Sequence, residues 1–338
     1  MIGKKDIKKY FNEAAGFKVL IVGDVMIDSY IWGRVDRISP EAPVPIVTVN
    51  RRTSLLGGAA NVALNIKAVG SHPILCSVIG NDSKGDEFLQ LLEKEALATE
   101  GIVRSKERIT TTKFRIIGNN YQMLRVDEET DTELHARETE DLLNRFTQLI
   151  KTYPVDIIII QDYNKGVLTP KVIQKITARA SELHIPVAVD PKKRNFSEYK
   201  SVALFKPNLK ELIEGLKIDF DPYDTDHLRE AVQAFQKKQD IDHMLVTLSD
   251  KGVFISSRMG EHAYITHSVP AYVRSIADVS GAGDTVISLA ALCLALKMTP
   301  LDIATISNLA GGLVCESVGV VPIDKTRLLD ELTHMAHS

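Results

Sequence analysis

The 338-residue sequence has only three cysteines, and none of them belongs to a C-x-x-C pair. Cys76, Cys293 and Cys315 are widely spaced, which argues against a zinc motif and against a disulfide framework. Free thiols persist in reducing compartments, so this cysteine content favours a cytoplasmic protein.

Long apolar runs are also missing. The longest one, Val286 to Leu296, is well short of the roughly 20 residues that a membrane-spanning helix needs. Residues 1–17 mix lysines with apolar side chains, which predicts a short amphipathic helix and not the uninterrupted apolar core of a signal peptide. We therefore expect no association with a membrane.

The charge balance gives no sign of a nucleic-acid partner. The formal net charge is −3, so the chain has no basic field that would attract a polyanion. Hydrophobic residues make up 44% and charged residues 25% of the chain, as in ordinary folded proteins. We expect one domain over residues 1–338 whose ligands are small molecules.

Two familiar phosphate-binding motifs are absent. No G-x-x-x-x-G-K-[ST] sequence occurs, which excludes a P-loop. Gly281 and Gly283 form a G-x-G pair, but Val286 stands where a dinucleotide-binding fingerprint has its third glycine. A nicotinamide-dependent dehydrogenase is therefore a distant alternative.

The stretch Asp278-Val279-Ser280-Gly281-Ala282-Gly283-Asp284 precedes an apolar segment that is typical of a buried helix. Glycines in the first turn of a helix expose backbone N–H groups without a Cβ, and such groups bind anions. This composition favours a phosphate-binding helix start. The alternative is an ordinary helix capped by Ser280 or Asp278.

Asp284 is unusual beside a phosphate, because a carboxylate repels a bound anion. A general base must lie beside the phosphate, because it accepts the proton of the hydroxyl group that attacks the phosphorus. We therefore interpret Asp284 as a candidate catalytic base.

Most of the chain predicts an α/β fold. Helical segments at residues 82–94, 138–151 and 170–183 alternate with apolar strand-like runs at residues 18–23, 74–79, 155–161, 186–189, 202–205 and 243–248. Such alternation is typical of a three-layer α/β/α architecture with a mainly parallel central sheet. Ligands bind beyond the carboxyl ends of parallel strands, which draws attention to Asp24, Asp162, Lys165 and Lys192. A turn-capping role is the alternative for Asp24.

Two β-rich segments, residues 29–52 and 110–127, fall outside this alternation. Prolines interrupt the first segment, which predicts edge strands, and Gly118-Asn119-Asn120 predicts a hairpin turn in the second. We interpret the two segments as a small β lid that excludes water from a site. A homodimer through the lid strands is also expected.

Two further motifs carry polar groups. Gly57 and Gly58 precede a helix with Asn61 in its first turn, which favours recognition of hydroxyl groups over a plain helix start. Asn208 and Glu211 are three residues apart, so on a helix they share a face that can hold Mg²⁺ through its waters. A capping box explains the same spacing.

These residues resemble the ribokinase-like, or PfkB, family of carbohydrate kinases. Residues 57–63 resemble the N-terminal signature of the family, and Asn208-x-x-Glu211 resembles its magnesium motif. Residues 278–284 resemble its C-terminal signature D-T-x-G-A-G-D, with Val279-Ser280 in place of Thr-x. Within the family, residues 23–28, 37–45, 112–115 and 162–166 resemble the kinases that phosphorylate D-glycero-β-D-manno-heptose 7-phosphate at C1 in ADP-heptose synthesis.

The resemblance implies ATP and Mg²⁺ as cofactors, with a monovalent cation such as K⁺ as a further candidate. Asp284 would be the base, next to an anion hole formed at Gly281, Ala282 and Gly283. The sugar phosphate would contact Asp24, Gly57, Gly58, Asn61 and Asp162, and its 7-phosphate would contact Arg115, Lys165 and Lys192. The nucleotide would lie near Asn208, Glu211, Thr247, Ser249, Gly252 and Asn308.

Other functions remain compatible with the sequence. A kinase of this family could instead act on fructose phosphate, ribose or a nucleoside, and a basic cluster at the sugar pocket would favour a phosphorylated substrate. A non-catalytic sugar-binding regulator is a less favoured alternative. In bifunctional relatives a nucleotidyltransferase domain follows the kinase, and since this chain ends at Ser338 we expect that second activity to be absent.

Overall fold

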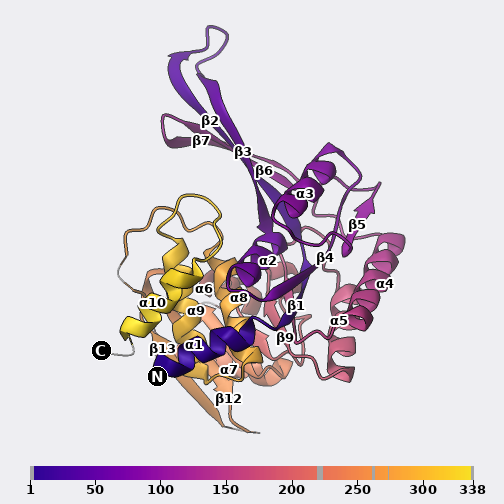
Figure 1. Cartoon of the computed structure of the whole chain (residues 1–338), viewed down its shortest axis with the longest axis vertical. Coiled ribbons are helices and arrows are strands. Elements are labelled where there is room, and N and C mark those ends of the chain that lie inside the picture. The colour runs from indigo at the N-terminus through magenta and orange to yellow at the C-terminus, as the bar shows by residue number, and fades with distance from the viewer. Residues whose placement is uncertain (1–3, 219–223, 261–262, 273, 336–338) are drawn as a thin grey trace.

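The structure is a computed structural model that describes residues 4–218, 224–260, 263–272 and 274–335 (Figure 1). Its main sheet has nine strands in the order β13-β12-β11-β10-β9-β8-β1-β4-β5. The strands from β11 to β5 run parallel, whereas β12 and β13 are antiparallel to their neighbours. The strands are β1 (Lys18–Gly23), β4 (His72–Gly80), β5 (Ile102–Ser105), β8 (Ile157–Gln161), β9 (Val187–Asp190), β10 (Leu204–Phe205), β11 (His243–Thr247), β12 (Val253–Arg258) and β13 (Tyr264–Val269).

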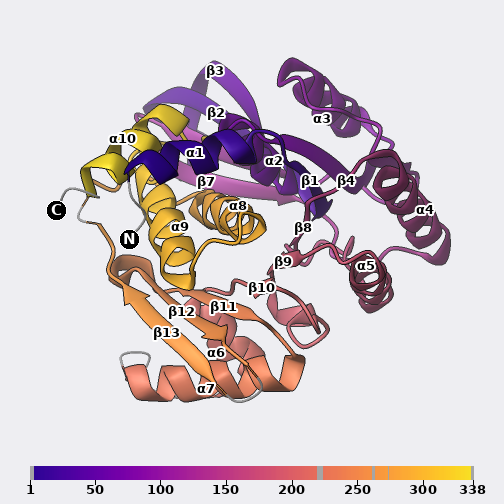
Figure 2. The ribbon, with the colours of Figure 1, turned by 60° about the horizontal axis from the view of Figure 1, so that its bottom comes forward.

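Helices cover both faces of this sheet (Figure 2). Along β1, Val19 and Ile21 join one apolar core while Leu20 and Val22 join the other, as expected for a strand buried on both faces. The first core is covered by α1 (Lys4–Ala14), α2 (Ala59–Ala68), α3 (Ser83–Lys94), α8 (Ala282–Ala295), α9 (Pro300–Val314) and α10 (Lys325–Met335). The second is covered by α4 (Ala136–Thr152), α5 (Pro170–Glu182), α6 (Leu209–Leu216) and α7 (Thr225–Gln239).

The predicted three-layer α/β/α architecture is confirmed, and most predicted elements lie within a few residues of the observed ones. The sequence interpretation missed β5, β13 and α7. Strand β10 is shorter than expected, because only two residues pair in the sheet. In the part of the chain that the structure describes, no helix combines the length and the apolar character needed to cross a membrane.

A second, four-stranded sheet projects from the body (Figure 1). It consists of β2 (Val25–Ile38), β3 (Pro45–Gly58), β6 (Thr112–Gly118) and β7 (Tyr121–Glu128), in the order β3-β2-β6-β7. The hairpin turn lies at Asn119 and Asn120, which both have positive φ. The expectation of edge strands was wrong for β2, which pairs with a strand on each side because Pro40 and Pro43 lie in the turn after it.

The projecting sheet has two unlike faces. Asp28 pairs with Lys113 and Tyr30 with Arg115, and these polar residues share one face. The register places Ile31 beside Ile116, and Ile116 beside Leu124, on the opposite face. The polar face turns toward the body, because the Tyr30 hydroxyl lies against Gly319.

Candidate active site

Helix α8 begins at the glycine-rich stretch. Its N-cap is Gly281, whose φ of 81° lies in the left-handed region that favours glycine. A Cβ at this position would lie 2.9 Å from Nδ2 of Asn61. Ser280 and Asp278 are therefore not the N-cap. Asp278 instead accepts hydrogen bonds from the backbone N–H groups of Ser280 and Gly319, both at 2.9 Å, and fixes the loop before the helix.

Asp284 lies in the first turn of α8 and is only 3% exposed. Three side chains donate hydrogen bonds to its carboxylate. Asn61 Nδ2 lies 2.8 Å from Oδ2, while Tyr163 Oη and Gln161 Nε2 lie 2.7 Å and 3.1 Å from Oδ1. The donors come from α2, from the last residue of β8 and from the loop after β8. The fold thus gathers distant residues around one carboxylate.

Burial raises the pKa of Asp284 to about 7. The hydrogen bonds from Asn61 and Tyr163 favour the charged form and lower the pKa, while the nearby charge of Asp190 raises it and that of Lys206 lowers it. A carboxyl group with a pKa near neutrality suits general base catalysis at physiological pH.

A second buried acid lies beside Asp284. Asp190 ends β9, and its Oδ2 lies 3.1 Å from Lys206 Nζ and accepts a hydrogen bond from Gln161. Oδ1 of Asp190 is buried and has no hydrogen-bond partner among the described residues. An orphaned carboxylate oxygen in such a place is a candidate ligand for a cation.

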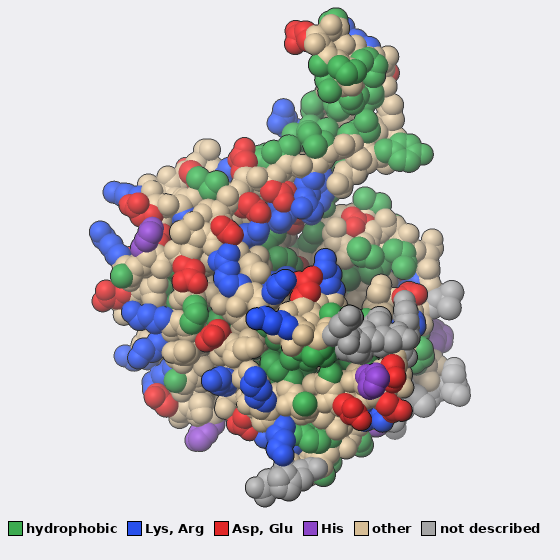
Figure 3. Space-filling model, turned by 180° about the vertical axis from the view of Figure 1, so that it is seen from behind, with side chains coloured by type: hydrophobic (Ala, Val, Ile, Leu, Met, Phe, Trp, Pro, Cys, Tyr) green, Lys and Arg blue, Asp and Glu red, His purple; other side chains and the backbone are tan. Residues whose placement is uncertain are grey.

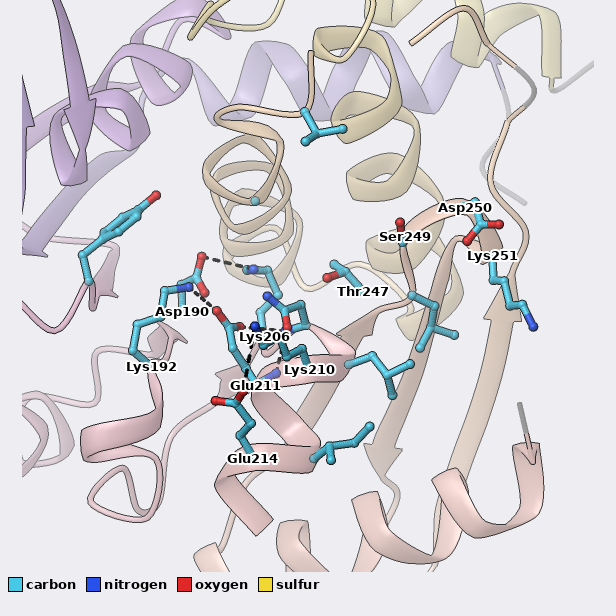
Figure 4. A pocket seen from close by; sticks show the side chains of 17 residues that line it. Asp190, Lys192, Lys206, Lys210, Glu211, Glu214, Thr247, Ser249, Asp250 and Lys251 are labelled. Carbon is cyan, nitrogen blue, oxygen red and sulfur yellow. Dashed lines mark hydrogen bonds and ion pairs between the residues drawn. The ribbon is translucent and has the colours of Figure 1, made fainter. Parts of the chain in front are cut away.

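Asp190 and Lys206 line a cavity of about 760 Å³, whose lining side chains are drawn in Figure 4. Such a volume is typical of small-molecule sites. Lys192 and Glu211 form an ion pair at its wall, and Gly283 also lines it. Other lining residues are Tyr163, Asn208, Thr247 and Ser249.

A smaller cavity of about 250 Å³ has walls in common with the first, among them Thr247, Ser249 and Gly283. The predicted nucleotide residues Gly252 and Asn308 line this second cavity. All six residues predicted to lie near a nucleotide therefore border one of the two cavities.

Asn208 and Glu211 form the capping box of α6. Asn208 Oδ1 accepts a hydrogen bond from the Glu211 N–H, and Glu211 Oε2 accepts one from the Asn208 N–H, both at 2.8 Å. The other carboxylate oxygen of Glu211 pairs with Lys192 at the cavity wall. The two interpretations of this motif are therefore compatible, because one side chain can cap the helix and face the cavity.

Asp24 and Asp162 are buried and engaged with protein groups. Asp24 accepts hydrogen bonds from the backbone N–H groups of Tyr163, Lys165 and Val167 at 2.8–3.1 Å. Asp162 accepts hydrogen bonds from the side chains of Asn195 and Tyr199. Burial raises the pKa of Asp24, and burial together with the Asp24 charge raises that of Asp162 to about 6. Both carboxylates thus hold the 162–167 loop.

The glycine pair before α2 is required by close packing. A Cβ at Gly57 would lie 2.2 Å from Oδ2 of Asp28, and one at Gly58 would lie 2.5 Å from the carbonyl oxygen of Asp24. Gly58 also has a φ of 61°. These residues let β2 and β3 approach the carboxyl end of β1.

The three cations predicted to hold the distal phosphate have different acidic partners. Arg115 pairs with Asp28 on the projecting sheet, Lys165 pairs with Glu129, and Lys192 pairs with Glu211. Lys192 lines the larger cavity. Each of the three side chains is therefore already paired with an acid in the structure.

The sequence interpretation assigned no role to Gln161, Tyr163, Asp190 or Lys206. Gln161 and Asp190 end parallel strands, and Tyr163 and Lys206 lie within two residues of a strand end. The rule that ligands bind at the carboxyl ends of parallel strands could have found all four.

Comparisons with known proteins place the chain in a family. The sequence model described as pfkB family carbohydrate kinase matches residues 17–327. The bifunctional protein HldE of Citrifermentans bemidjiense is 35% identical over 335 residues, which is 98% of this chain and 67% of that protein. The HldE protein of Campylobacter fetus subsp. fetus is 38% identical over 304 residues, which is 89% of this chain and 63% of that protein. The chain thus spans about two thirds of the length of these relatives.

Solved structures share the fold. Phosphofructokinase-2 from Escherichia coli in complex with potassium has a TM-score of 0.77 at 19% identity, covering 96% of this chain and 99% of that chain. Arabidopsis thaliana ribokinase complexed with ribose and ATP has a TM-score of 0.68 at 15% identity. The match covers 93% of this chain and 99% of that chain.

The family match extends over most of the chain, and it includes the glycine-flanked acid at the start of α8. Carbohydrate kinases of the matched family use ATP and Mg²⁺ in general. The chain belongs to the pfkB family of carbohydrate kinases, which are phosphotransferases with a sugar hydroxyl group as acceptor.

Proposed function

We propose that this protein phosphorylates D-glycero-β-D-manno-heptose 7-phosphate at C1, with ATP as the phosphoryl donor. The identity to HldE proteins over nearly the whole chain supports this substrate, as do the subgroup motifs at residues 37–45 and 162–166. The product would be the 1,7-bisphosphate, a precursor in ADP-heptose synthesis.

The observation that carries the proposal is the position of Asp284. Its carboxylate is held by three donors, one residue after Gly283, which lines both cavities. An ATP molecule in these cavities would direct its terminal phosphate toward the N–H groups of Ala282, Gly283 and Asp284. Asp284 would then accept the proton of the sugar hydroxyl as its oxygen attacks phosphorus.

The residues at the cavity wall fit a magnesium ion. Asp190 presents an unpartnered buried oxygen, and Glu211 places a carboxylate on the same cavity. No group of three or more His, Cys, Asp or Glu side chains in the described residues forms a metal cage. Such sparse ligation suits Mg²⁺, which keeps several waters and binds phosphate oxygens. When bound, the ion would neutralise charge on the phosphates, and Lys192 and Lys206 would add to this.

We propose that the sugar phosphate binds at the polar face of the projecting sheet. The sheet would act as a lid over it. Lys165 Nζ and Lys113 Nζ lie 2.6 Å and 3.4 Å from the two carboxylate oxygens of Glu129. One lysine comes from the body and the other from β6, so an anion that took the place of the Glu129 carboxylate between them would join lid and body. We propose that the distal phosphate binds here and beside Arg115, and that Lys192 serves the transferred phosphate instead.

The projecting sheet also carries an unusual number of exposed apolar side chains. Figure 3 shows hydrophobic side chains over much of the projecting sheet. A surface of this kind marks an interaction site, and we propose that a second copy of the chain covers it. The exposed residues are Ile38, Val44, Val49, Tyr121, Met123, Leu124 and Val126.

The test measures ADP release by the purified protein with ATP, Mg²⁺ and a panel of sugar phosphates. We expect turnover with heptose 7-phosphate to exceed that with fructose 6-phosphate by at least about 100-fold in kcat/KM, and ³¹P NMR to show a new anomeric phosphate. A preference for fructose 6-phosphate would instead make the protein a kinase of another sugar phosphate.

A further inference from the structure

The two carboxylate oxygens of Asp284 are not equivalent. Oδ1 accepts two hydrogen bonds, from Tyr163 Oη at 2.7 Å and from Gln161 Nε2 at 3.1 Å. Oδ2 accepts one, from Asn61 Nδ2 at 2.8 Å. A carboxylate oxygen offers about two lone-pair sites. Oδ1 is therefore saturated by protein groups, whereas Oδ2 retains a free site.

The donors to Oδ1 are held in place from behind. The backbone N–H of Tyr163 is bound by the buried carboxylate of Asp24, which also binds the N–H groups of Lys165 and Val167. Gln161 ends β8, and its Nε2 also donates to Asp190. The Gln161 amide cannot turn away without also losing its bond to Asp190, and Asp24 fixes the backbone from which the Tyr163 ring reaches Oδ1. Displacing them by a substrate hydroxyl would therefore cost hydrogen bonds.

Oδ2 is bound by Asn61, which itself lies against the helix start at Gly281. Asn61, its protein donor, lies so close to Gly281 that a Cβ there would lie 2.9 Å from Asn61 Nδ2. Asn61 Oδ1 is buried without a partner among the described residues. A sugar hydroxyl at Oδ2 would therefore sit beside the phosphoryl group, with a neighbouring acceptor for a second hydroxyl.

We propose that Tyr163 and Gln161 are positioning residues that occupy Oδ1 of Asp284 and so make Oδ2 the proton-accepting atom. This inference rests on the proposed role of Asp284 as the base. In the step, the sugar O–H bond breaks and its proton forms a bond to Oδ2. The sugar oxygen bonds to the terminal phosphorus of ATP, and the bond from that phosphorus to the bridging oxygen breaks, so that ADP leaves with the electron pair.

The charges around Asp284 set the direction of the expected effect. Asp190 raises its pKa and Lys206 lowers it, while Lys192 lies nearby with its Nζ 5.4 Å from the centre of the Tyr163 ring. Asn61, Tyr163 and Gln161 are neutral donors that favour the charged carboxylate. Loss of the Tyr163 hydroxyl removes one donor and leaves the charges in place, so the carboxyl group should hold its proton to higher pH.

The experiment compares Tyr163→Phe with a matched control, Tyr199→Phe. Tyr199 is buried whereas Tyr163 is partly exposed, but its hydroxyl also donates at 2.7 Å to a buried carboxylate, that of Asp162. Both variants lose a tyrosine hydroxyl from an acid, but only Tyr163→Phe loses it from Asp284. Gln161→Glu is the second test variant, because it replaces the other Oδ1 donor by an acid of the same shape.

Two readouts are measured for each variant. One is the pH profile of kcat/KM with whichever sugar phosphate the protein accepts best. The other is the pKa of the Asp284 carboxyl group, followed by the ¹³C resonance of its carboxyl carbon in ¹³C-aspartate-labelled protein without substrate. This resonance is assigned as the one that is missing in Asp284→Asn. We expect Tyr163→Phe to move the acidic limb and the NMR pKa upward by about one pH unit, a tenfold change in proton affinity. Gln161→Glu should move both further, and Tyr199→Phe should move neither.

Unchanged limbs in Tyr163→Phe and Gln161→Glu, or an equal shift in Tyr199→Phe, would overturn the positioning role. If no sugar phosphate is turned over but the NMR pKa still shifts only in the two test variants, Tyr163 and Gln161 do act on Asp284, but the proposed function fails and the catalytic part of the inference fails with it. Should the protein be active while the NMR pKa stays constant in both test variants, the inference fails and the proposed function stands.

Discussion

Nδ2 of Asn61 donates a hydrogen bond of 2.8 Å to Oδ2 of Asp284 across 223 residues of sequence. Asn61 belongs to the glycine-flanked start of α2, and Asp284 to that of α8. The two signatures that stand apart in the sequence therefore form one site. This contact also distinguishes the two carboxylate oxygens, because Asn61 binds Oδ2 while Tyr163 and Gln161 bind Oδ1.

Asp284→Asn should fold and bind ATP but lose about 10²- to 10⁴-fold in kcat, because it removes the base and leaves the anion hole. The amide can be accommodated if Asn61 turns its unpartnered oxygen toward the new NH₂ group. Steady-state kinetics and ATP binding by calorimetry provide the measurement. A kcat within threefold of the parent would refute the base assignment.

The same variant should be more stable at high pH. The pKa of Asp284 is about 7 in the folded chain against 3.8 as the reference, so the folded state binds more protons and loses stability as pH rises from about 4 to 7. Asparagine does not titrate, so the variant should gain no free energy of unfolding over the parent below pH 4. The gain should reach up to about 4 kcal/mol above pH 7. Urea denaturation at pH 5 and pH 8 tests this sign; an equal difference at both pH values would contradict it.

Two glycine variants should distinguish the backbone conformation that the start of α8 requires from the space that the cavity requires. Gly281→Ala forces a left-handed φ and a contact with Asn61, so we expect a loss of about 1–3 kcal/mol in stability together with loss of activity. At Gly283 the nearest atoms to a new Cβ are 3.7 Å away, so Gly283→Ala should keep the stability of the parent. Its methyl group enters the cavity wall and should lower kcat/KM for ATP. Thermal unfolding and kinetics of both variants decide the point.

Glu211→Gln should raise the Mg²⁺ concentration needed for half-maximal rate by about tenfold, the effect of an outer-sphere partner of the ion. Glutamine can still accept the hydrogen bond of the capping box, so the start of α6 should persist. Magnesium titrations at saturating ATP measure the shift. The control is Glu182→Gln at the end of α5, which pairs with Arg179 on the surface, lines neither cavity and should have little effect.

Lys113→Met and Lys165→Met should each raise KM for heptose 7-phosphate by about 10- to 100-fold, the loss expected for one charge-assisted hydrogen bond. KM for ATP should change little, because neither lysine lines the nucleotide cavities. Arg179→Met, at a surface ion pair of α5, is the control. An unchanged KM for the sugar phosphate in both lysine variants would remove them from the distal-phosphate site.

Leu124→Glu should convert a dimer into a monomer, because it places a charge in the proposed apolar interface on β7. Leu183→Glu is the control, since Leu183 is also exposed but follows α5 on the body. Light scattering after size-exclusion chromatography gives the mass of each species. A parent protein that is monomeric at high concentration would exclude the interface.

Much of the fold could be read from the sequence, since apolar runs of strand length alternate with amphipathic segments. The start of α8 was also predictable, because Gly281 and Gly283 precede an apolar helix. Asp284 stood out as a carboxylate in an anion-binding turn. The paired glycines at 57–58 were recognised too, although the close approach of Asp28 and Asp24 that requires them was not.

Patterns along the chain thus determined which elements form, which strand ends face the site and which residue is the candidate base. Only the tertiary structure decided that Asp24 binds the loop after β8, that Gln161 and Tyr163 both donate to one oxygen of Asp284, and that Lys192 and Arg115 pair with different acids. The reason is physical. Periodicity places a side chain on a face or an edge, but its rotamer, its partners and its pKa depend on groups more than a hundred residues away that folding packs around it in a water-poor interior.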